Sequence, residues 1–260
     1  MSNIHTILIT GASRGLGHAL ATRFAQTGHT VFAVGRDAAA LEQLQANYPQ
    51  LISPIVADIV TDAGREIIYQ HVTRVGKPLS IIHNAAIANT CEFSDINESI
   101  LQNYFATNVF APILLTQQCL PLLTAGQRIL HISSGAAAFA LANQLTYCAT
   151  KAALEHVSRC MNLELAAQQV HSGILWPGMM NTPMAEKLRT LGKDHVREFY
   201  IKAKTQQQLL EPTVVAQFVE WVLLKTTNQD FSTKTWDVYD IEQHPNWLPK
   251  GITTPTYNVV

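Results

Sequence analysis

The chain has 260 residues, of which 47% are hydrophobic and 14% charged, and its formal net charge is −1. A chain of this length and composition can bury a sizeable core, whereas scattered charges that nearly cancel give no electrostatic basis for binding nucleic acid or an anionic membrane. The N-terminal residues lead directly into a β-rich run, without the segments of a signal peptide or the apolar length of a membrane span. We therefore expect a soluble, cytoplasmic protein.

Four cysteines and ten histidines are dispersed along the chain, with no CxxC, HxxxH or HExxH spacing. The cysteines lie mostly in apolar sequence of helical character, which favours buried free thiols over a redox or metal-binding role. We therefore predict no metal site.

Short apolar, β-rich runs alternate with segments of helical periodicity along the chain. The predicted strands are nearly continuously apolar, which is typical of parallel strands covered on both faces. They are residues 4–10, 31–34, 52–56, 79–83, 128–133, 170–175 and 235–238, and the clearest helices are 16–27, 38–47 and 213–224. Repeated βα units predict a doubly wound α/β sheet in one domain over residues 1–260, because no linker or repeat divides the chain. Only residues 182–208, polar and helix-leaning, break the alternation and indicate a lid-like insertion.

A glycine-rich segment follows the first predicted strand and opens the first predicted helix. Glycines serve where a pyrophosphate must approach main-chain N–H groups at a helix N-terminus. Three glycines alone would also fit an ordinary turn, but their position between strand and helix favours phosphate binding. The Gly-x-x-x-Gly-x-Gly spacing resembles that of the short-chain dehydrogenases/reductases. The resemblance implies cofactor contacts from Gly11, Ser13, Arg14, Gly15, Leu16 and Gly17.

The end of the second predicted strand bears on the choice of dinucleotide. NAD enzymes place an acidic residue there to accept from the ribose hydroxyls, whereas NADP enzymes need a cation for the 2′-phosphate. In the family that this chain resembles, the acid of NAD-type members falls at Gly35, and the next residue here is Arg36. Arg36, with Arg14 as a second cation, therefore predicts NADP(H) as the cofactor. The alternative is a solvated arginine at a helix start, beside Asp37 as the helix cap.

Tyr147 and Lys151 stand four residues apart at the start of a long predicted helix, so they share one face. We expect the ammonium and an oxidised nicotinamide to favour the phenolate and to lower the pKa of Tyr147 towards the working range. The family resemblance implies that Ser134, thirteen positions before the tyrosine and preferred to Ser133, holds the carbonyl oxygen. It also implies that Asn108 keeps a proton-relaying water in place; a purely structural role within its helix is the alternative.

Three further segments match the same family in order and spacing. The resemblance implies that Asp58 bonds the adenine amino group and that Met180 and Thr182 hold the nicotinamide carboxamide. Ala86 stands where the family has glycine, which puts the fit of that loop in doubt. The cofactor contacts implied in these segments are Asp58, Asn84, Ala85, Pro177, Gly178, Met180 and Thr182. The resemblance covers residues 4 to about 182 and implies a Rossmann-type parallel sheet of about seven strands.

Substrate recognition depends on residues outside this shared core. Small side chains from Gly135 onwards leave room for a bulky ketone, and Met179 and Met184 are candidate apolar contacts. The segment around Asp237 resembles the C-terminal strand of sepiapterin reductases, whose aspartate there anchors the pterin. A structural strand-end carboxylate is the alternative for Asp237. The surroundings of Tyr147 and the extension beyond residue 240 also resemble benzil-type 1,2-diketone reductases of the same family.

The main functional hypothesis is an NADPH-dependent oxidoreductase that reduces a small-molecule ketone or 1,2-dicarbonyl to the alcohol, with Tyr147 as the acid. One alternative is a 3-oxoacyl reductase that docks an acyl carrier on Lys187, Arg189 and Lys193; another is a different NADP-dependent alcohol or hydroxysteroid-type dehydrogenase. A non-catalytic dinucleotide sensor is disfavoured because Tyr147 and Lys151 are both kept. The family resemblance implies a homodimer or homotetramer that pairs through the helices over residues 97–123 and 147–168, and the wide apolar faces of these helices agree with it.

Overall fold

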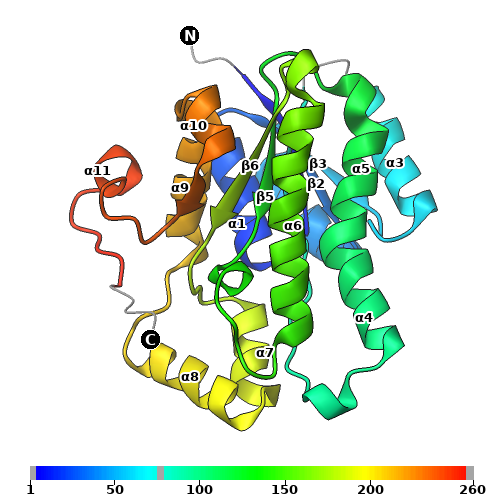
Figure 1. Ribbon diagram of the computed structural model, residues 1–260. Coiled ribbons are helices and arrows are strands. Elements are labelled where there is room, and N and C mark those ends of the chain that lie inside the picture. Colours follow the sequence, from blue (N-terminus) through cyan, green and yellow to red (C-terminus); the bar gives the residue numbers. More distant parts are fainter. Residues whose placement is uncertain (1–3, 75–78, 256–260) are drawn as a thin grey trace.

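A computed structural model describes residues 4–74 and 79–255, and within them a seven-stranded sheet has the order β3-β2-β1-β4-β5-β6-β7 (Figure 1). All neighbouring strands pair in parallel. The strands are β1 Thr6–Thr10, β2 Thr30–Gly35, β3 Ile52–Val56, β4 Leu79–His83, β5 Arg128–Ile132, β6 His171–Trp176 and β7 Thr235–Asp237. The predicted doubly wound α/β class is confirmed, and each strand ends within two residues of its predicted bounds.

Helices cover both faces of the sheet. Successive side chains of a strand point to opposite faces, so Ile7 and Ile9 of β1 join one core cluster while Leu8 joins the other. In Figure 1, α5 and α6 lie on the near side of the sheet, and α1 lies behind β5 and β6. The first cluster lies beneath α1 Gly15–Gln26, α2 Ala38–Asn47 and α9 Pro212–Lys225; the second lies beneath α3 Asp62–Thr73, α5 Ala111–Cys119 and α6 Leu145–Glu164.

The strand β3 departs from a continuously apolar pattern because it contains Pro54 and is only partly buried. A proline cannot donate to a sheet ladder, so it is tolerated where one side of the strand has no partner. The strand order places β3 at an edge of the sheet, with β2 as its one neighbour. The proline therefore agrees with this topology.

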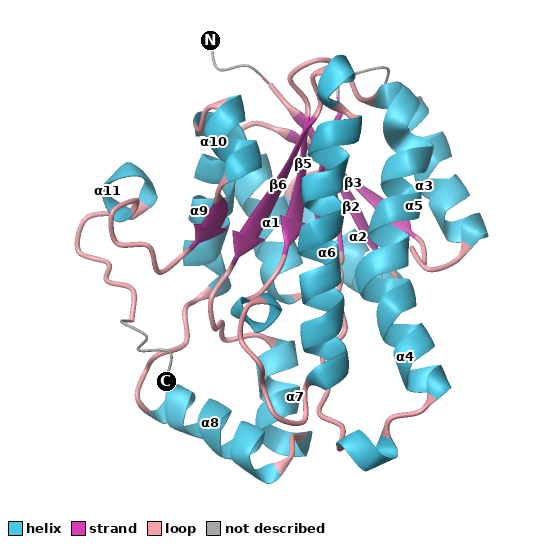
Figure 2. Ribbon diagram, in the orientation of Figure 1, coloured by secondary structure: helices cyan, strands magenta, loops and turns pink. Residues whose placement is uncertain are grey.

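The predicted lid-like segment forms two helices, α7 Pro183–Leu191 and α8 Asp194–Thr205, beyond the carboxyl end of β6. Figure 2 shows the arrowheads of β5 and β6 pointing towards the end of the molecule where these helices lie. The backbone N–H of Lys193 donates to the Thr90 hydroxyl at 3.0 Å, and the Lys193 ammonium pairs with Glu92 at 2.7 Å. These contacts join the segment to the loop that follows β4.

The helix expected over residues 97–123 is interrupted. It forms α4 Glu98–Phe105, a π-helical turn η2 Ala106–Phe110, and α5, with the short turn η3 Leu120–Leu122 after it. A π-turn inserts an extra residue into a helix and is frequent at functional sites. Asn108 lies within this turn, and its side chain makes the contacts described below.

The cysteines are less buried than the sequence predicts. All four cysteines are free, but only Cys119 is buried; Cys91, Cys148 and Cys160 are half-buried, because the apolar sequence around them faces solvent in part. Over the ranges 4–74 and 79–255, no helix combines the length and apolarity that crossing a bilayer requires. The remaining described α-helices are α10 Asn228–Thr233 and α11 His244–Trp247, and the remaining 3₁₀ turns are η1 Phe93–Asp95, η4 Gly135–Ala137 and η5 Ala166–Gln168.

Candidate active site

The loop between β1 and α1 has a backbone that requires glycine. Gly11 and Gly15 have φ angles of 70° and 56°, in the left-handed region that other residues rarely adopt. A Cβ on Gly17 would lie 2.1 Å from the carbonyl oxygen of Gly11, and a Cβ on Gly11 would lie 2.9 Å from the Cα of Ala85. Backbone segments that approach so closely leave no space for side chains. The predicted glycines are therefore explained by this geometry.

The N-terminus of α1 faces this loop without a side-chain cap. Arg14 at the N-cap makes no capping hydrogen bond, and the first turn contains no acidic residue. The buried hydroxyl of Ser13 has no hydrogen-bond partner among the residues that the structure describes. Unpaired helix N–H groups, the helix dipole and an orphaned hydroxyl together suit a bound anion. These residues thus fit the phosphates of a dinucleotide.

The loop after β4 is held against the glycine loop by Asn84 and Thr10. The Asn84 side-chain amide donates to the carbonyl oxygens of Thr10 at 2.9 Å and Gly11 at 3.3 Å. In return, the Thr10 hydroxyl accepts from the backbone N–H groups of Asn84 at 3.0 Å and Ala85 at 3.1 Å. The segments at residues 10–17 and 84–85 therefore form one rigid unit, and Thr10 is a supporting residue that sequence analysis missed.

At the end of β2, Gly35 lies against Ser13. A Cβ on Gly35 would lie 2.1 Å from the Ser13 hydroxyl, so the hydroxyl would have to rotate away to admit a side chain at the position where NAD-type members carry an acid. The adjacent Arg36 is 70% exposed, and its guanidinium lies 3.5 Å from the Asp58 carboxylate. The predicted adenine and phosphate contacts therefore lie next to each other.

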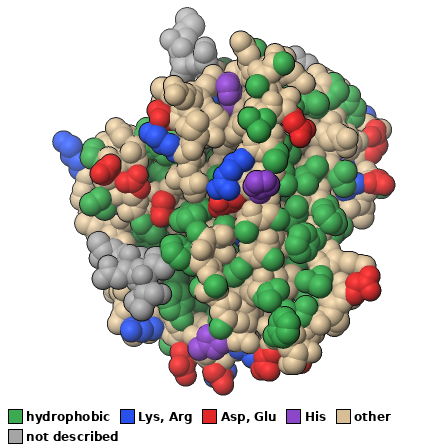
Figure 3. Space-filling model, viewed as in Figure 1, with side chains coloured by type: hydrophobic (Ala, Val, Ile, Leu, Met, Phe, Trp, Pro, Cys, Tyr) green, Lys and Arg blue, Asp and Glu red, His purple; other side chains and the backbone are tan. Residues whose placement is uncertain are grey.

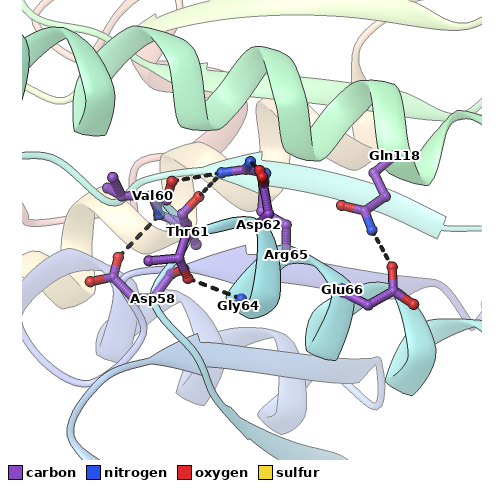
Figure 4. A network of polar contacts seen from close by, with 9 residues as sticks. Asp58, Val60, Thr61, Asp62, Gly64, Arg65, Glu66 and Gln118 are labelled. Carbon is purple, nitrogen blue, oxygen red and sulfur yellow. Dashed lines mark hydrogen bonds and ion pairs between the residues drawn. The ribbon is translucent and has the colours of Figure 1, made fainter.

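The guanidinium of Arg65 on α3 holds the loop that follows Asp58, as Figure 4 shows. The buried guanidinium of Arg65 donates to the carbonyl oxygens of Ile59 at 2.9 Å and Val60 at 2.8 Å, and it also pairs with Asp62. One carboxylate oxygen of Asp58 accepts from the Val60 N–H at 3.1 Å, so the side chain has a fixed direction.

Ser134, Tyr147 and Lys151 come together where β5 ends and α6 begins. The Ser134 hydroxyl lies close enough to the Tyr147 phenol to act on its pKa. The Lys151 ammonium lies 5.8 Å from the centre of the Tyr147 ring and donates to the carbonyl oxygen of Ile132 at 2.7 Å. Ser133 is turned away from this group, because its hydroxyl donates to Glu155 at 2.8 Å. The geometry thus favours Ser134 over its neighbour, as the sequence predicts.

The electrostatics of this group differ from expectation. Burial raises the pKa of Tyr147 to about 12, although the Ser134 hydroxyl acts to lower it. Burial also lowers the pKa of Lys151 to about 8, against the opposing charge of Glu155. The expected lowering of the Tyr147 pKa is therefore wrong for the protein by itself, because desolvation of the phenolate outweighs the stabilising contacts. The phenol is held protonated near neutral pH, in the form that a proton donor needs.

Comparison with known proteins decides the family. A family model described as short chain dehydrogenase matches residues 5–191. The chain belongs to the short-chain dehydrogenase family. It is similar to the L-xylulose reductase of Caenorhabditis elegans, with 34% identity over 184 residues that cover 68% of this chain and 72% of that one.

Two further likenesses agree with this assignment. The NADPH-dependent pterin aldehyde reductase of Arabidopsis thaliana is 31% identical over 189 residues, covering 69% of this chain and 76% of the relative. The crystal structure of a short-chain dehydrogenase/reductase from Saccharomyces cerevisiae matches with a TM-score of 0.87 at 21% identity, over 94% of this chain and 100% of that one. The predicted family is confirmed, and the protein is an oxidoreductase with the fold of that family.

In this short-chain dehydrogenase, Asn108 joins three elements. Its amide donates to the carbonyl oxygen of Ile87 at 3.0 Å and to the Thr150 hydroxyl at 3.0 Å, and its oxygen accepts from the Ile87 N–H at 2.9 Å. The π-turn around Asn108 is thereby fixed to the loop after β4 and to α6, next to Lys151. These bonds show that the side chain joins the π-turn to α6 and to the loop after β4; water relay stays a prediction.

The loop after β6 is supported by the C-terminal strand. Gly178 has a φ of 69°, and a Cβ there would lie 2.7 Å from the Tyr239 ring and hydroxyl. The Tyr239 hydroxyl accepts from the Met179 N–H at 2.9 Å. Asp237 accepts from the Tyr239 N–H at 3.0 Å, so its carboxylate stabilises the turn that presents Tyr239. The structure therefore gives Asp237 a structural contact, while its predicted contact with substrate stays a prediction.

The other residues predicted for the β6 end lie as follows. Thr182 caps α7 by accepting from the Ala185 N–H at 3.3 Å, and its methyl group is 3.5 Å from the Cβ position of Gly15. Met180 forms an isolated parallel bridge with Leu210, which closes the base of the α7–α8 segment. Met184, on α7, is 36% exposed. Thr182 is thus brought next to the glycine loop, as a contact to the same cofactor requires.

Glu155 was missed by sequence analysis. It is 5% exposed, lies one helical turn after Lys151 on α6, and accepts from Ser133, Trp176 and Arg159. The signal available in the sequence was an acidic residue at i+4 from the lysine, on a face that must pack against the sheet.

Proposed function

We propose that this short-chain dehydrogenase is an NADPH-dependent reductase that converts a ketone or 1,2-dicarbonyl compound to the alcohol. The observation that carries the proposal is the Ser134–Tyr147–Lys151 group, placed at the same edge of the sheet as the uncapped α1 N-terminus and its glycine loop. Carboxyl ends of parallel strands meet at one edge, and ligands of doubly wound sheets bind there. A proton donor and a dinucleotide cradle at one edge support hydride-transfer chemistry.

In this proposal each residue has a defined task. NADPH, when bound, supplies the hydride to the carbonyl carbon. Tyr147 donates its phenolic proton to the carbonyl oxygen, and Ser134 donates a hydrogen bond to the same oxygen and stabilises the developing alkoxide. Lys151 holds a positive charge beside the phenol and stabilises the phenolate that remains. The residues proposed to hold the cofactor are Gly11, Ser13, Arg14, Gly15, Leu16, Gly17, Asn84, Ala85, Pro177, Gly178, Met180 and Thr182.

The preference for NADPH is argued from Arg36 and Gly35. Gly35 offers no acid to accept from the ribose hydroxyls, and the guanidinium of Arg36 is exposed, so it can meet a 2′-phosphate on the solvent side. Asp58 pairs with Arg36 at 3.5 Å and holds it at the mouth of the adenine site. The NADPH dependence of the Arabidopsis relative agrees with this proposal.

The 3-oxoacyl alternative receives little support from the lid. Lys193 is paired with Glu92, and one guanidinium nitrogen of Arg189 is buried. Of the three cations expected to dock an acyl carrier, Lys187 is exposed, whereas Arg189 and Lys193 are half-buried. The relatives named for xylulose and pterin aldehyde act on small soluble carbonyl compounds, which favours the same substrate class here.

We also propose self-association through α4, α5 and α6. Figure 3 shows hydrophobic side chains gathered over the face that these helices occupy in Figure 1. The exposed apolar residues of this face are Leu101, Phe110, Leu114, Leu145 and Leu163. A patch of this kind on a monomer marks an interaction surface, and symmetric homodimers are the commonest oligomers. Sedimentation at micromolar concentration tests this, since a purely monomeric protein would contradict it.

The proposed function is tested by following NADPH oxidation against a panel of sepiapterin, 1,2-diketones, acetoacetyl thioesters and steroid ketones. Turnover of a ketone or diketone by the wild-type protein is expected, with loss of that turnover in Tyr147→Phe. Turnover of the thioesters alone would replace the proposal with the 3-oxoacyl function.

A further inference from the structure

A buried carboxylate, Glu155, bonds two groups at the ends of neighbouring strands. One of its oxygens accepts both from the Ser133 hydroxyl at 2.8 Å and from the indole N–H of Trp176 at 2.6 Å. The other oxygen accepts from the guanidinium of Arg159 at 3.1 Å. Burying a carboxylate costs several kcal/mol unless such bonds offset it. The three hydrogen bonds to Glu155 offset this cost, and they fix the groups that donate them.

The group fixed by this carboxylate is the indole of Trp176, the last residue of β6. Its ring meets the ring of Phe139 edge to face, with centroids 6.3 Å apart. Phe139 is 43% exposed and Trp176 is half-buried, so both rings are partly accessible to solvent. We call Trp176 and Phe139 the aromatic wall.

The aromatic wall stands on either side of the segment that carries Ser134. On one side, the Ser133 N–H donates to the carbonyl oxygen of Leu175 at 2.8 Å, which places Trp176 next to Ser133. On the other, the Phe139 N–H donates to the carbonyl oxygen of Gly135 at 2.9 Å. A Cβ on Gly135 would lie 3.7 Å from the Phe139 ring, so the wall continues directly from the residue after Ser134.

Other tryptophans show that this anchoring is not a general feature of the protein. Trp236 and Trp247 are buried in the core, and neither indole N–H has a hydrogen-bond partner among the described residues. Trp176, by contrast, is only half-buried but has a carboxylate acceptor at 2.6 Å. The Glu155 carboxylate thus fixes the ring of Trp176, the tryptophan beside the proposed catalytic group. At that place the orientation of the ring affects how a substrate can pack against it.

We propose that Glu155 is a positioning residue that fixes Trp176 so that the aromatic wall receives a flat ring attached to the reacting carbonyl. This inference rests on the proposed function and specifies its substrate class: aryl-substituted ketones and 1,2-diketones in preference to open-chain ones. Aromatic rings pack favourably edge to face or offset, and a side chain locked in its rotamer loses no further freedom when the substrate binds. A small open-chain diketone would gain nothing from the wall.

The experiment compares 1-phenylpropane-1,2-dione with butane-2,3-dione as substrates of the full-length protein. Trp176→Phe retains an aromatic ring but has no N–H, so the ring is no longer fixed by Glu155; Glu155→Leu removes the acceptor. In both variants we expect KM for the phenyl diketone to rise about tenfold, equivalent to about 1.4 kcal/mol, with kcat changed less. KM for butane-2,3-dione and the affinity for NADPH are expected to stay within about twofold.

Two control variants separate positioning from charge and from general stability. Glu155→Gln retains one carbonyl oxygen for Ser133 and Trp176, so its substrate ratio should stay near that of the wild type. Arg159→Ala removes a hydrogen bond to the same carboxylate, but from a side chain that is 57% exposed, and should leave the ratio unchanged. Thermal unfolding of every variant reports any loss of folding, and Trp176→Phe provides the test if Glu155→Leu does not fold.

A binding measurement without turnover keeps this inference separate from the proposed function. In the presence of NADP⁺, which cannot reduce the diketone, calorimetry measures the affinity of the phenyl diketone directly. Weaker binding in Trp176→Phe and unchanged binding in Glu155→Gln support the wall even if no reduction is seen, in which case the proposed function alone fails. If Trp176→Phe weakens both diketones equally, or neither, the wall is structural and the inference is overturned.

Discussion

The proposed cofactor cradle and the proposed catalytic edge of this short-chain dehydrogenase are built in different ways. The cradle consists of backbone in contact with backbone: a side chain on Gly17 would reach the carbonyl oxygen of Gly11, and one on Gly11 would reach Ala85. The catalytic edge consists of side chains from distant segments, such as Asn108 bonded to Thr150 and Glu155 bonded to Trp176. Backbone contacts leave a signature of glycines at fixed spacing, whereas side-chain contacts can be made from many positions. The following predictions test this division, beginning with the largest expected effect.

Tyr147→Phe should lower kcat for ketone reduction by about 10²–10⁴-fold, because it removes the proposed proton donor and keeps the ring. NADPH affinity should change little, since the phenol acts in the transition state. Steady-state kinetics and a fluorescence titration with NADPH measure the two effects. Tyr69→Phe, on α3 away from the catalytic edge, serves as the control and should be unaffected. Substantial residual activity in Tyr147→Phe would show that another group donates the proton.

Gly17→Ala should weaken NADPH binding about a hundredfold, about 2.7 kcal/mol, because the added Cβ lies 2.1 Å from the Gly11 carbonyl oxygen and forces the cradle to shift. Gly28→Ala is the matched control: its φ of 86° strains an alanine, but no atom lies within 4 Å of the new Cβ. The control should lower Tm and leave NADPH affinity unchanged. If both variants lose affinity alike, the cradle is not the phosphate site.

The pH dependence should report Lys151. With its pKa lowered to about 8, the ammonium is lost as pH rises through 8, so kcat/KM for reduction should fall towards tenfold per pH unit above it. Stability should respond in the opposite sense: between pH 8 and 10.5 the unfolded chain binds the proton more strongly than the folded protein, so the folded state gains stability as pH rises. A kcat/KM profile flat to pH 10 would contradict the assignment of Lys151.

Asp237→Asn should have the smallest effect. The asparagine oxygen can still accept from the Tyr239 N–H, so the turn that supports the β6 loop is kept. KM for sepiapterin and for a 1,2-diketone should both stay within about twofold. A tenfold rise confined to sepiapterin would instead establish the substrate contact that the resemblance to sepiapterin reductases implies.

The sequence was sufficient for the parts of the molecule that depend on periodicity and glycine spacing. Apolar runs at regular intervals predict all seven strands, and Gly11, Gly15 and Gly17 predict the cradle because only their backbone geometry suits it. The π-turn at Asn108 could not be predicted, since its sequence has ordinary helical character and its shape depends on the bonds to Ile87 and Thr150.

The direction in which the pKa of Tyr147 shifts could not be predicted from the sequence either. It depends on how completely α6 and the β5 loop exclude water from the phenol, which is a property of packing. The role of Glu155 could not be predicted for a similar reason. Its partners Ser133 and Trp176 lie 22 and 21 residues away along the chain, and they become neighbours only when β5 and β6 pair.

The most direct test of NADPH-dependent reduction by this chain is the ratio of kcat/KM for NADPH to that for NADH, measured for the wild type and for Arg36→Asp with one ketone. The wild type should prefer NADPH by well over tenfold. Arg36→Asp should lose about 1.5–3 kcal/mol of that preference, as expected for one charge-assisted phosphate contact. Lys225→Glu, which reverses a charge beside His5 near the opposite end of the strands, should leave the ratio unchanged. Equal kcat/KM for the two cofactors in the wild type would contradict the proposal.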